Sequence, residues 1–79
     1  MNDKFVRILS DVLSLGASEI QPELQKCDVG TWDSLKQMDL VLSLEREYSI
    51  TLEIPDIVRM TSVSEIVDVL KAKGIEIDS

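Results

Sequence analysis

Histidine is absent from this 79-residue chain, and cysteine, proline and glycine are scarce, with one, two and three residues respectively. Without histidine the chain lacks the commonest general base and the commonest metal ligand, and Cys27 has no second cysteine for an internal disulfide or a zinc site. A chain this short has room for one modest core. The shortage of histidine and cysteine argues against a self-contained enzyme and against a metal site. The short length predicts a single domain over residues 1–79.

Positive charge is also in short supply. Fifteen acidic residues against eight basic ones give a net charge of −7, which repels nucleic acid and anionic lipid. No stretch approaches the roughly 18 apolar residues of a membrane span, and no cleavable signal sequence is evident. We therefore expect a cytoplasmic, monomeric protein that binds no nucleic acid, does not insert into membranes and docks on basic surfaces of partner proteins.

Apolar residues at helical spacing predict an all-α fold, a small bundle of four helices of which the third is short. The predicted helices cover residues 3–15, 34–48, 55–60 and 63–73. Gly16 is expected to end the first helix, and Pro55 is expected to open the third. A capping box of Ser62 and Glu65 precedes the last helix.

The segments between these helices are expected to be irregular. A loop over residues 16–33 is long enough to suspect a function. The apolar residues that could pin this loop onto the core are Ile20, Leu24 and Val29. Residues 49–54 alternate like a strand but have no partner strand, so we interpret them as an extended connector. The residues that this connector should bury are Ile50, Leu52 and Ile54. Residues 75–79 are expected to form a loose tail.

The second predicted helix has apolar residues on two faces. At about 100° per residue, one arc carries Leu40, Val41, Leu44 and Tyr48, and a second arc carries Leu35, Met38 and Leu42. Either the helix contacts neighbours on two sides, or the second arc is an exposed docking stripe beside Ser34. In the latter case Asp39 and Glu45 edge the stripe, which would meet a basic, hydrophobic groove on a partner.

Ser34 stands at the start of this helix, within Gly30-Thr31-Trp32-Asp33-Ser34-Leu35-Lys36. One interpretation is a helix cap, because Ser34 and Gln37 match the S/T-x-x-E/Q capping box and Asp33 adds favourable charge. The other is that the hydroxyl carries a phosphate, which the free N–H groups and the dipole of a helix N-terminus would favour. The local sequence leaves both open.

A longer pattern surrounds Ser34. It consists of Trp32-Asp33-Ser34-Leu35 followed by Met38, Leu40, Val41, Leu42, Leu44-Glu45, Glu47-Tyr48 and Ile50. Together with residues 57–60 and 61–63, this pattern resembles the acyl carrier protein family, in which an Asp-Ser-Leu motif opens the second of four helices. The resemblance covers nearly the whole chain.

The resemblance implies that Ser34 bears a 4′-phosphopantetheine arm, which a phosphopantetheinyl transferase adds from coenzyme A. The thiol of that arm would carry acyl or aminoacyl groups as thioesters, so the chain would be a carrier that serves loading and transferring enzymes and not an enzyme itself. The residues implied in partner recognition are Asp33, Leu35, Met38, Asp39, Leu42 and Glu45. A bound acyl chain could shelter between the helices against residues such as Leu44 and Ile57.

Two features depart from members of that family that are dedicated to fatty-acid synthesis. Lys36 and Arg46 place positive charge on the second helix, and Thr31-Trp32 stands where smaller residues are common. These departures predict a specialised carrier for a lipid, polyketide, peptide or amino-acid pathway. The start methionine and the lack of a linker at either end favour a free-standing protein. The competing hypothesis is an unmodified acidic helical interaction module in which Ser34 only caps the helix.

Overall fold

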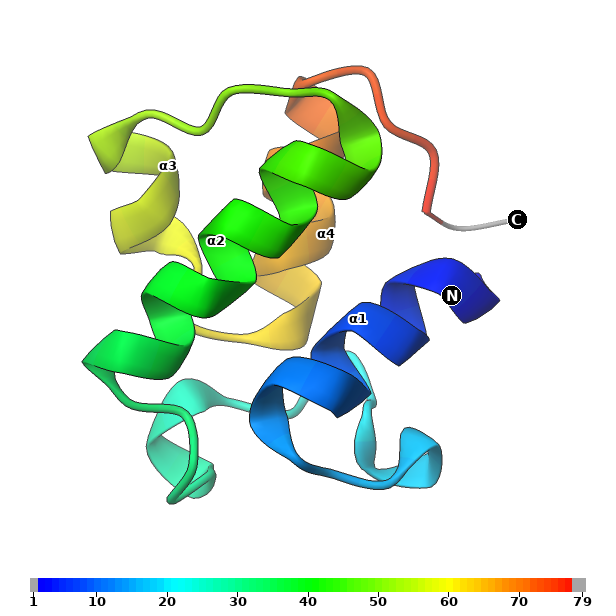
Figure 1. The fold of residues 1–79 in the computed structure, drawn as a ribbon, viewed down its shortest axis with the longest axis vertical. Helices are drawn as coiled ribbons and strands as arrows, with labels where there is room; N and C mark the ends of the chain where they lie inside the picture. Colours follow the sequence, from blue (N-terminus) through cyan, green and yellow to red (C-terminus); the bar gives the residue numbers. More distant parts are fainter. Residues whose placement is uncertain (1, 78–79) are drawn as a thin grey trace.

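The computed structural model describes residues 2–77, which form four α-helices (Figure 1). These are α1 (Asp3–Leu13), α2 (Ser34–Tyr48), α3 (Ile54–Arg59) and α4 (Val63–Ala72). Two 3₁₀ helices, η1 (Ala17–Glu19) and η2 (Lys26–Asp28), lie in the connection between α1 and α2. Over residues 2–77 there is no strand, only a single bridge between Gln25 and Ser62. The predicted all-α bundle with a short third helix is confirmed.

One hydrophobic core lies between the helices. Its fully buried side chains are Phe5, Leu9, Leu13, Leu40, Leu44, Met60, Val63, Ile66, Val69, Leu70 and Ile77. Helices α1 and α2 pack against each other, and α4 lies behind α2 (Figure 1). No helix within residues 2–77 is long and apolar enough to cross a membrane.

The end of α1 differs from the prediction. The helix ends at Leu13 because Ser14 adopts a left-handed conformation, with φ of 57°, and turns the chain before Gly16 is reached. Gly16 instead precedes η1, where its N–H donates to Glu19 Oε2 at 2.7 Å. Leu13, the last residue of α1, is fully buried, whereas Val12 before it is half-buried.

The long connection over residues 16–33 is held firmly on the core, as predicted. Ile20 and Val29 are buried, and Leu24 packs against the core from a half-buried position. Two backbone hydrogen bonds also join this connection to the start of α4. The N–H of Lys26 donates to the carbonyl of Thr61 at 2.8 Å, and the N–H of Val63 donates to the carbonyl of Leu24 at 3.0 Å. This connection therefore places Trp32 and Ser34 against a fixed part of the fold.

The connector between α2 and α3 buries less than predicted. Leu52 is buried and Ile50 is half-buried, but Ile54 is 76% exposed. The prediction for Ile54 is wrong because this residue is already the first residue of α3, one position before Pro55, and it lies on the outer side of that helix. The strand-like alternation therefore ends at Leu52.

Helix α3 is fastened to α4 by an ion pair. Lys73 Nζ lies 3.0 Å from Asp56 Oδ2, and the N–H of Glu53 donates to the same oxygen at 3.0 Å. The hydrogen bond from Glu53 and the ammonium of Lys73 lower the pKa of Asp56 below its ordinary value. Asp56 therefore stays ionised at the start of the short helix that flanks α2.

The segment after α4 is ordered up to Ile77. Gly74 turns the chain with φ of 88°, and the side chain of Ile77 is fully buried. The N–H of Asn2 donates to the carbonyl of Ile77 at 3.1 Å, which joins the start of α1 to the segment after α4 (Figure 1). The predicted loose tail is thus wrong for residues 75–77, and residues 78–79 lie outside the described part of the chain.

Candidate functional site

Asp33, and not Ser34, caps α2. Asp33 has an extended backbone and its Oδ1 accepts a hydrogen bond from the N–H of Lys36 at 2.9 Å, whereas Ser34 is already the first helical residue. The prediction of a capping box formed by Ser34 and Gln37 is therefore wrong. The hydroxyl of Ser34 is exposed and forms no hydrogen bond with any residue from 2 to 77.

The backbone around Ser34 is open to an anion. The first turn of a helix leaves N–H groups without intrahelical acceptors. The carboxylate of Asp33 accepts the N–H of Lys36, and its carbonyl accepts the N–H of Gln37 at 2.8 Å. The N–H groups of Ser34 and Leu35 therefore remain for an oxygen supplied from outside the helix. The free hydroxyl and these N–H groups together fit a phosphodiester attached to Ser34 Oγ.

Gln37 has a role that the sequence analysis missed. Its side chain is buried, its Oε1 accepts a hydrogen bond from Trp32 Nε1 at 2.7 Å, and its Nε2 donates to the carbonyls of Ile57 and Met60, each at 3.1 Å. Gln37 thus joins the residue two positions before Ser34 to the end of α3. The sequence could have indicated this role, because Gln37 lies on the buried arc of α2, where a polar side chain needs hydrogen-bond partners.

The second apolar arc of α2 is exposed. The side chains of Leu35, Met38 and Leu42 are 78%, 49% and 56% exposed, while Leu40, Val41 and Leu44 of the first arc are buried. The interpretation that both arcs contact neighbouring helices is wrong, because only the first arc enters the core. We refer to Leu35, Met38 and Leu42 as the exposed stripe.

Helix α3 adds two exposed apolar side chains that the sequence analysis did not assign to the site. Ile54 and Val58 are 76% and 69% exposed, and α3 is held beside α2 through Gln37 (Figure 1). The sequence could have indicated this pair, because Ile54 and Val58 are four residues apart in a helix that begins near Pro55 and so lie on the same face. Leu44 and Ile57, the residues expected to shelter an acyl chain, are respectively fully buried and half-buried against the core.

The two carboxylates predicted to edge the stripe differ in their surroundings. Asp39 is exposed, whereas Glu45 is half-buried and its Oε2 accepts a hydrogen bond from the N–H of Leu52 at 2.8 Å. One oxygen of Glu45 therefore holds the connector after α2. Of the two basic residues on this helix, Lys36 is half-buried and Arg46 is exposed.

Comparison with known proteins agrees with this geometry. The model of a family described as "phosphopantetheine attachment site" matches residues 3–70. The acyl carrier protein of Clostridium acetobutylicum is 31% identical over 70 residues, which cover 89% of this chain and 91% of that protein. The acyl carrier proteins of Syntrophus aciditrophicus and Nitratidesulfovibrio vulgaris are 27% and 25% identical over 79 and 73 residues, covering 99% and 92% of this chain and 98% and 96% of those proteins.

The family match covers most of the chain, and the relatives align over nearly their full lengths. The helical bundle and the open helix start at Ser34 are consistent with a protein that holds a covalent 4′-phosphopantetheine group and leaves catalysis to other proteins. This chain therefore belongs to the acyl carrier protein family and is a carrier protein, not an enzyme.

Proposed function

We propose that Ser34 is the residue to which 4′-phosphopantetheine is attached. The observation that carries this proposal is the free hydroxyl of Ser34 in the first turn of α2, where Asp33 has taken over the capping that Ser34 would otherwise perform. A serine needed only as a cap would have its oxygen bound to a backbone N–H. The hydroxyl of Ser34 is instead available for transfer of the arm.

The neighbouring residues support such an arm. The unpaired N–H groups at the start of α2 and the helix dipole favour the phosphodiester. Trp32 is buried and held by Gln37, so the backbone that leads to Ser34 is fixed while the side chain of Ser34 faces solvent. When attached, the group supplies a flexible thiol that can carry acyl or aminoacyl cargo as a thioester.

The exposed stripe is the proposed recognition surface for the phosphopantetheinyl transferase and for loading and transferring enzymes. It begins directly after Ser34, so an enzyme that covers it brings its active site close to the arm. An apolar stripe that stays in water on a folded protein is typical of an interaction surface. Asp33, Asp39 and Glu45 add carboxylates around it, which suit basic partner surfaces.

Lys36 and Arg46 support a finer proposal, that this is a specialised carrier for a lipid, polyketide, peptide or amino-acid pathway. They give α2 a mixed charge, and charge pairs across an interface select partners as well as attract them. We further propose that the carrier is a cytoplasmic monomer. The competing function is an unmodified interaction module that uses the same stripe.

Intact-mass measurement after incubation with coenzyme A and a broad-specificity transferase tests this proposal. We expect a phosphopantetheinyl-sized gain in the unmodified protein and none in Ser34→Ala. Ser64→Ala is the matched control, because Ser64 is also an exposed serine in the first turn of a helix, and it should gain the same mass as the natural sequence. If no gain occurs with a transferase that modifies another carrier in the same assay, the interaction module becomes the better account.

A further inference from the structure

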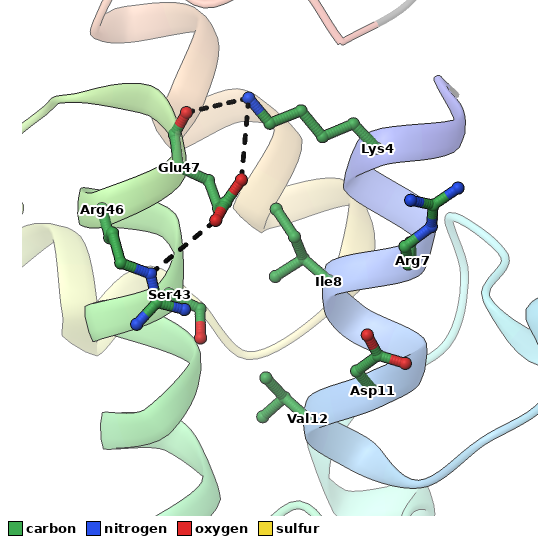
Figure 2. A pocket seen from close by; sticks show the side chains of 8 residues that line it. All are labelled: Lys4, Arg7, Ile8, Asp11, Val12, Ser43, Arg46 and Glu47. Atoms are coloured by element: carbon green, nitrogen blue, oxygen red, sulfur yellow. Dashed lines mark hydrogen bonds and ion pairs between the residues drawn. The ribbon is translucent and has the colours of Figure 1, made fainter.

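A groove of about 330 Å³ lies between α1 and α2 (Figure 2). Ile8 and Val12 point from α1 toward α2, and Ser43 and Arg46 line the opposite wall. At about 100° per residue, Ser43 lies on a different face of α2 from the exposed stripe. Arg46, however, follows Leu42 by four residues and lies beside the stripe, so the groove adjoins the surface proposed for the enzymes that act on the arm.

Two basic side chains of the groove form ion pairs with Glu47, whereas the guanidinium of Arg7 forms none within the described part of the chain. Lys4 Nζ donates to the carbonyl of Glu47 at 2.9 Å, and the carboxylate of Glu47 lies 3.9 Å from Lys4 Nζ and 3.7 Å from Arg46 Nε (Figure 2). Lys4 also lies over the ring of Tyr48, 4.7 Å from its centroid. The guanidinium of Arg7, in contrast, forms no ion pair or hydrogen bond with any residue between 2 and 77.

The charge of this groove is opposite to that of the protein. Three of the eight basic residues line it, namely Lys4, Arg7 and Arg46, together with two of the fifteen acidic ones, Asp11 and Glu47. The rest of the chain holds thirteen acidic residues and five basic ones. An acidic ligand that the rest of this surface repels is therefore attracted here.

We propose that the groove docks an acidic segment of a partner protein. An apolar side chain of that segment would rest on Ile8 and Val12, and its carboxylates would pair with Arg7 and Arg46, whose guanidinium groups suit bidentate contact with carboxylates. Because Arg46 also borders the exposed stripe, a partner bound here reaches the edge of the surface proposed for the enzymes that act at Ser34.

The test is a nuclear magnetic resonance titration of the full, unmodified chain with a short synthetic peptide in which leucine is flanked by glutamates. We expect amide shifts to change at Arg7, Val12 and Ser43. Reversal of charge in the double variant Arg7→Glu, Arg46→Glu should weaken binding by about tenfold or more. Both side chains are exposed, so the variant should keep its fold, which circular dichroism checks.

The control is Arg59→Glu, which reverses one charge on α3, half the change of charge in the double variant, and it should bind the peptide as the natural sequence does. The proposal is overturned if a peptide with glutamine in place of glutamate binds equally well, or if Arg59→Glu loses as much affinity as the double variant. It is also overturned if the shifts map to another surface, or if inorganic phosphate or an oligonucleotide produces the same shifts. Because the unmodified chain is used, none of these outcomes bears on attachment at Ser34.

Discussion

At the residue scale, the adjacent side chains of Asp33 and Ser34 have different roles. Aspartate and serine both cap helices well, so the sequence alone could not say which of them does so here. The backbone decides, because the capping residue must be extended and Asp33 is the last extended residue before α2. The position of Ser34 at the helix start was therefore predictable, but its freedom from hydrogen bonds was not.

This division of roles predicts different costs for two alanine substitutions. Asp33→Ala should lower the free energy of unfolding by about 1 kcal/mol, the usual value of a lost N-cap, because the N–H of Lys36 loses its acceptor. Ser34→Ala should change it by less than about 0.5 kcal/mol, as expected for an exposed site without contacts. Urea unfolding followed by circular dichroism measures both, and a larger loss in Ser34→Ala would show that the serine caps the helix after all.

Gln37 provides a second prediction at this scale. Gln37→Ala removes the partner of Trp32 Nε1 and of the buried carbonyl of Met60, while the carbonyl of Ile57 keeps the N–H of Met60. The substitution should cost about 1 to 3 kcal/mol for the buried polar groups left unpaired. Gln21→Ala is the control, because Gln21 is exposed and its side chain makes one local hydrogen bond, to the carbonyl of Ser18. Equal unfolding free energies of the two variants would contradict the role given to Gln37.

At the scale of elements, α2 is the part of the fold that its sequence predicts best. Two apolar arcs follow from the 3.6-residue period alone. Which arc is buried depends on the neighbours, since α1 and the other helices cover Leu40, Val41 and Leu44 and leave the exposed stripe in water. The connector after α2 was harder to predict, because the alternation over residues 49–54 hides the start of α3 at Ile54.

The two arcs predict opposite responses to substitution. Met38→Glu or Leu42→Glu should leave the unfolding free energy within about 0.5 kcal/mol. Either should lower kcat/KM of the phosphopantetheinyl transferase by a factor on the order of ten, because a charge enters the proposed contact. Leu44→Ala should instead cost about 2 to 5 kcal/mol, as for other buried leucines.

The control for the stripe is Ala72→Glu, which adds the same charge at an exposed position of α4 and should leave kcat/KM unchanged. An equal loss of kcat/KM in Ala72→Glu would mean that the added charge, and not its place on α2, weakens recognition. A decrease of more than about 2 kcal/mol in the free energy of unfolding of Met38→Glu would place Met38 among the core residues.

At the scale of the whole molecule, the ends of the described chain pack together. Ile77 is fully buried, and its carbonyl accepts the N–H of Asn2 across nearly the full length of the sequence. A local pattern of isoleucines separated by polar residues does not reveal such a contact, because it depends on where α1 lies. The bundle of four helices was predictable, whereas this closure needed the three-dimensional structure.

This closure predicts that Ile77→Ala lowers the free energy of unfolding by about 2 to 5 kcal/mol, the range for large-to-small changes in a core. Glu76→Ala, at the exposed neighbouring position, should change it by less than about 0.5 kcal/mol. Thermal unfolding of the two variants side by side is sufficient for this comparison. Matching melting temperatures would mean that residues 75–77 contribute nothing to the core.

The central claim, that Ser34 holds the arm, is tested most directly by mapping the attached mass within the modified chain. Cleavage after Lys26 and Lys36 releases residues 27–36, which contain Ser34 as their only serine together with Thr31 and Cys27. Fragment ions of this peptide should place the whole phosphopantetheinyl mass on Ser34. Mass on Thr31 or Cys27, or on a peptide from another part of the chain, would contradict the account.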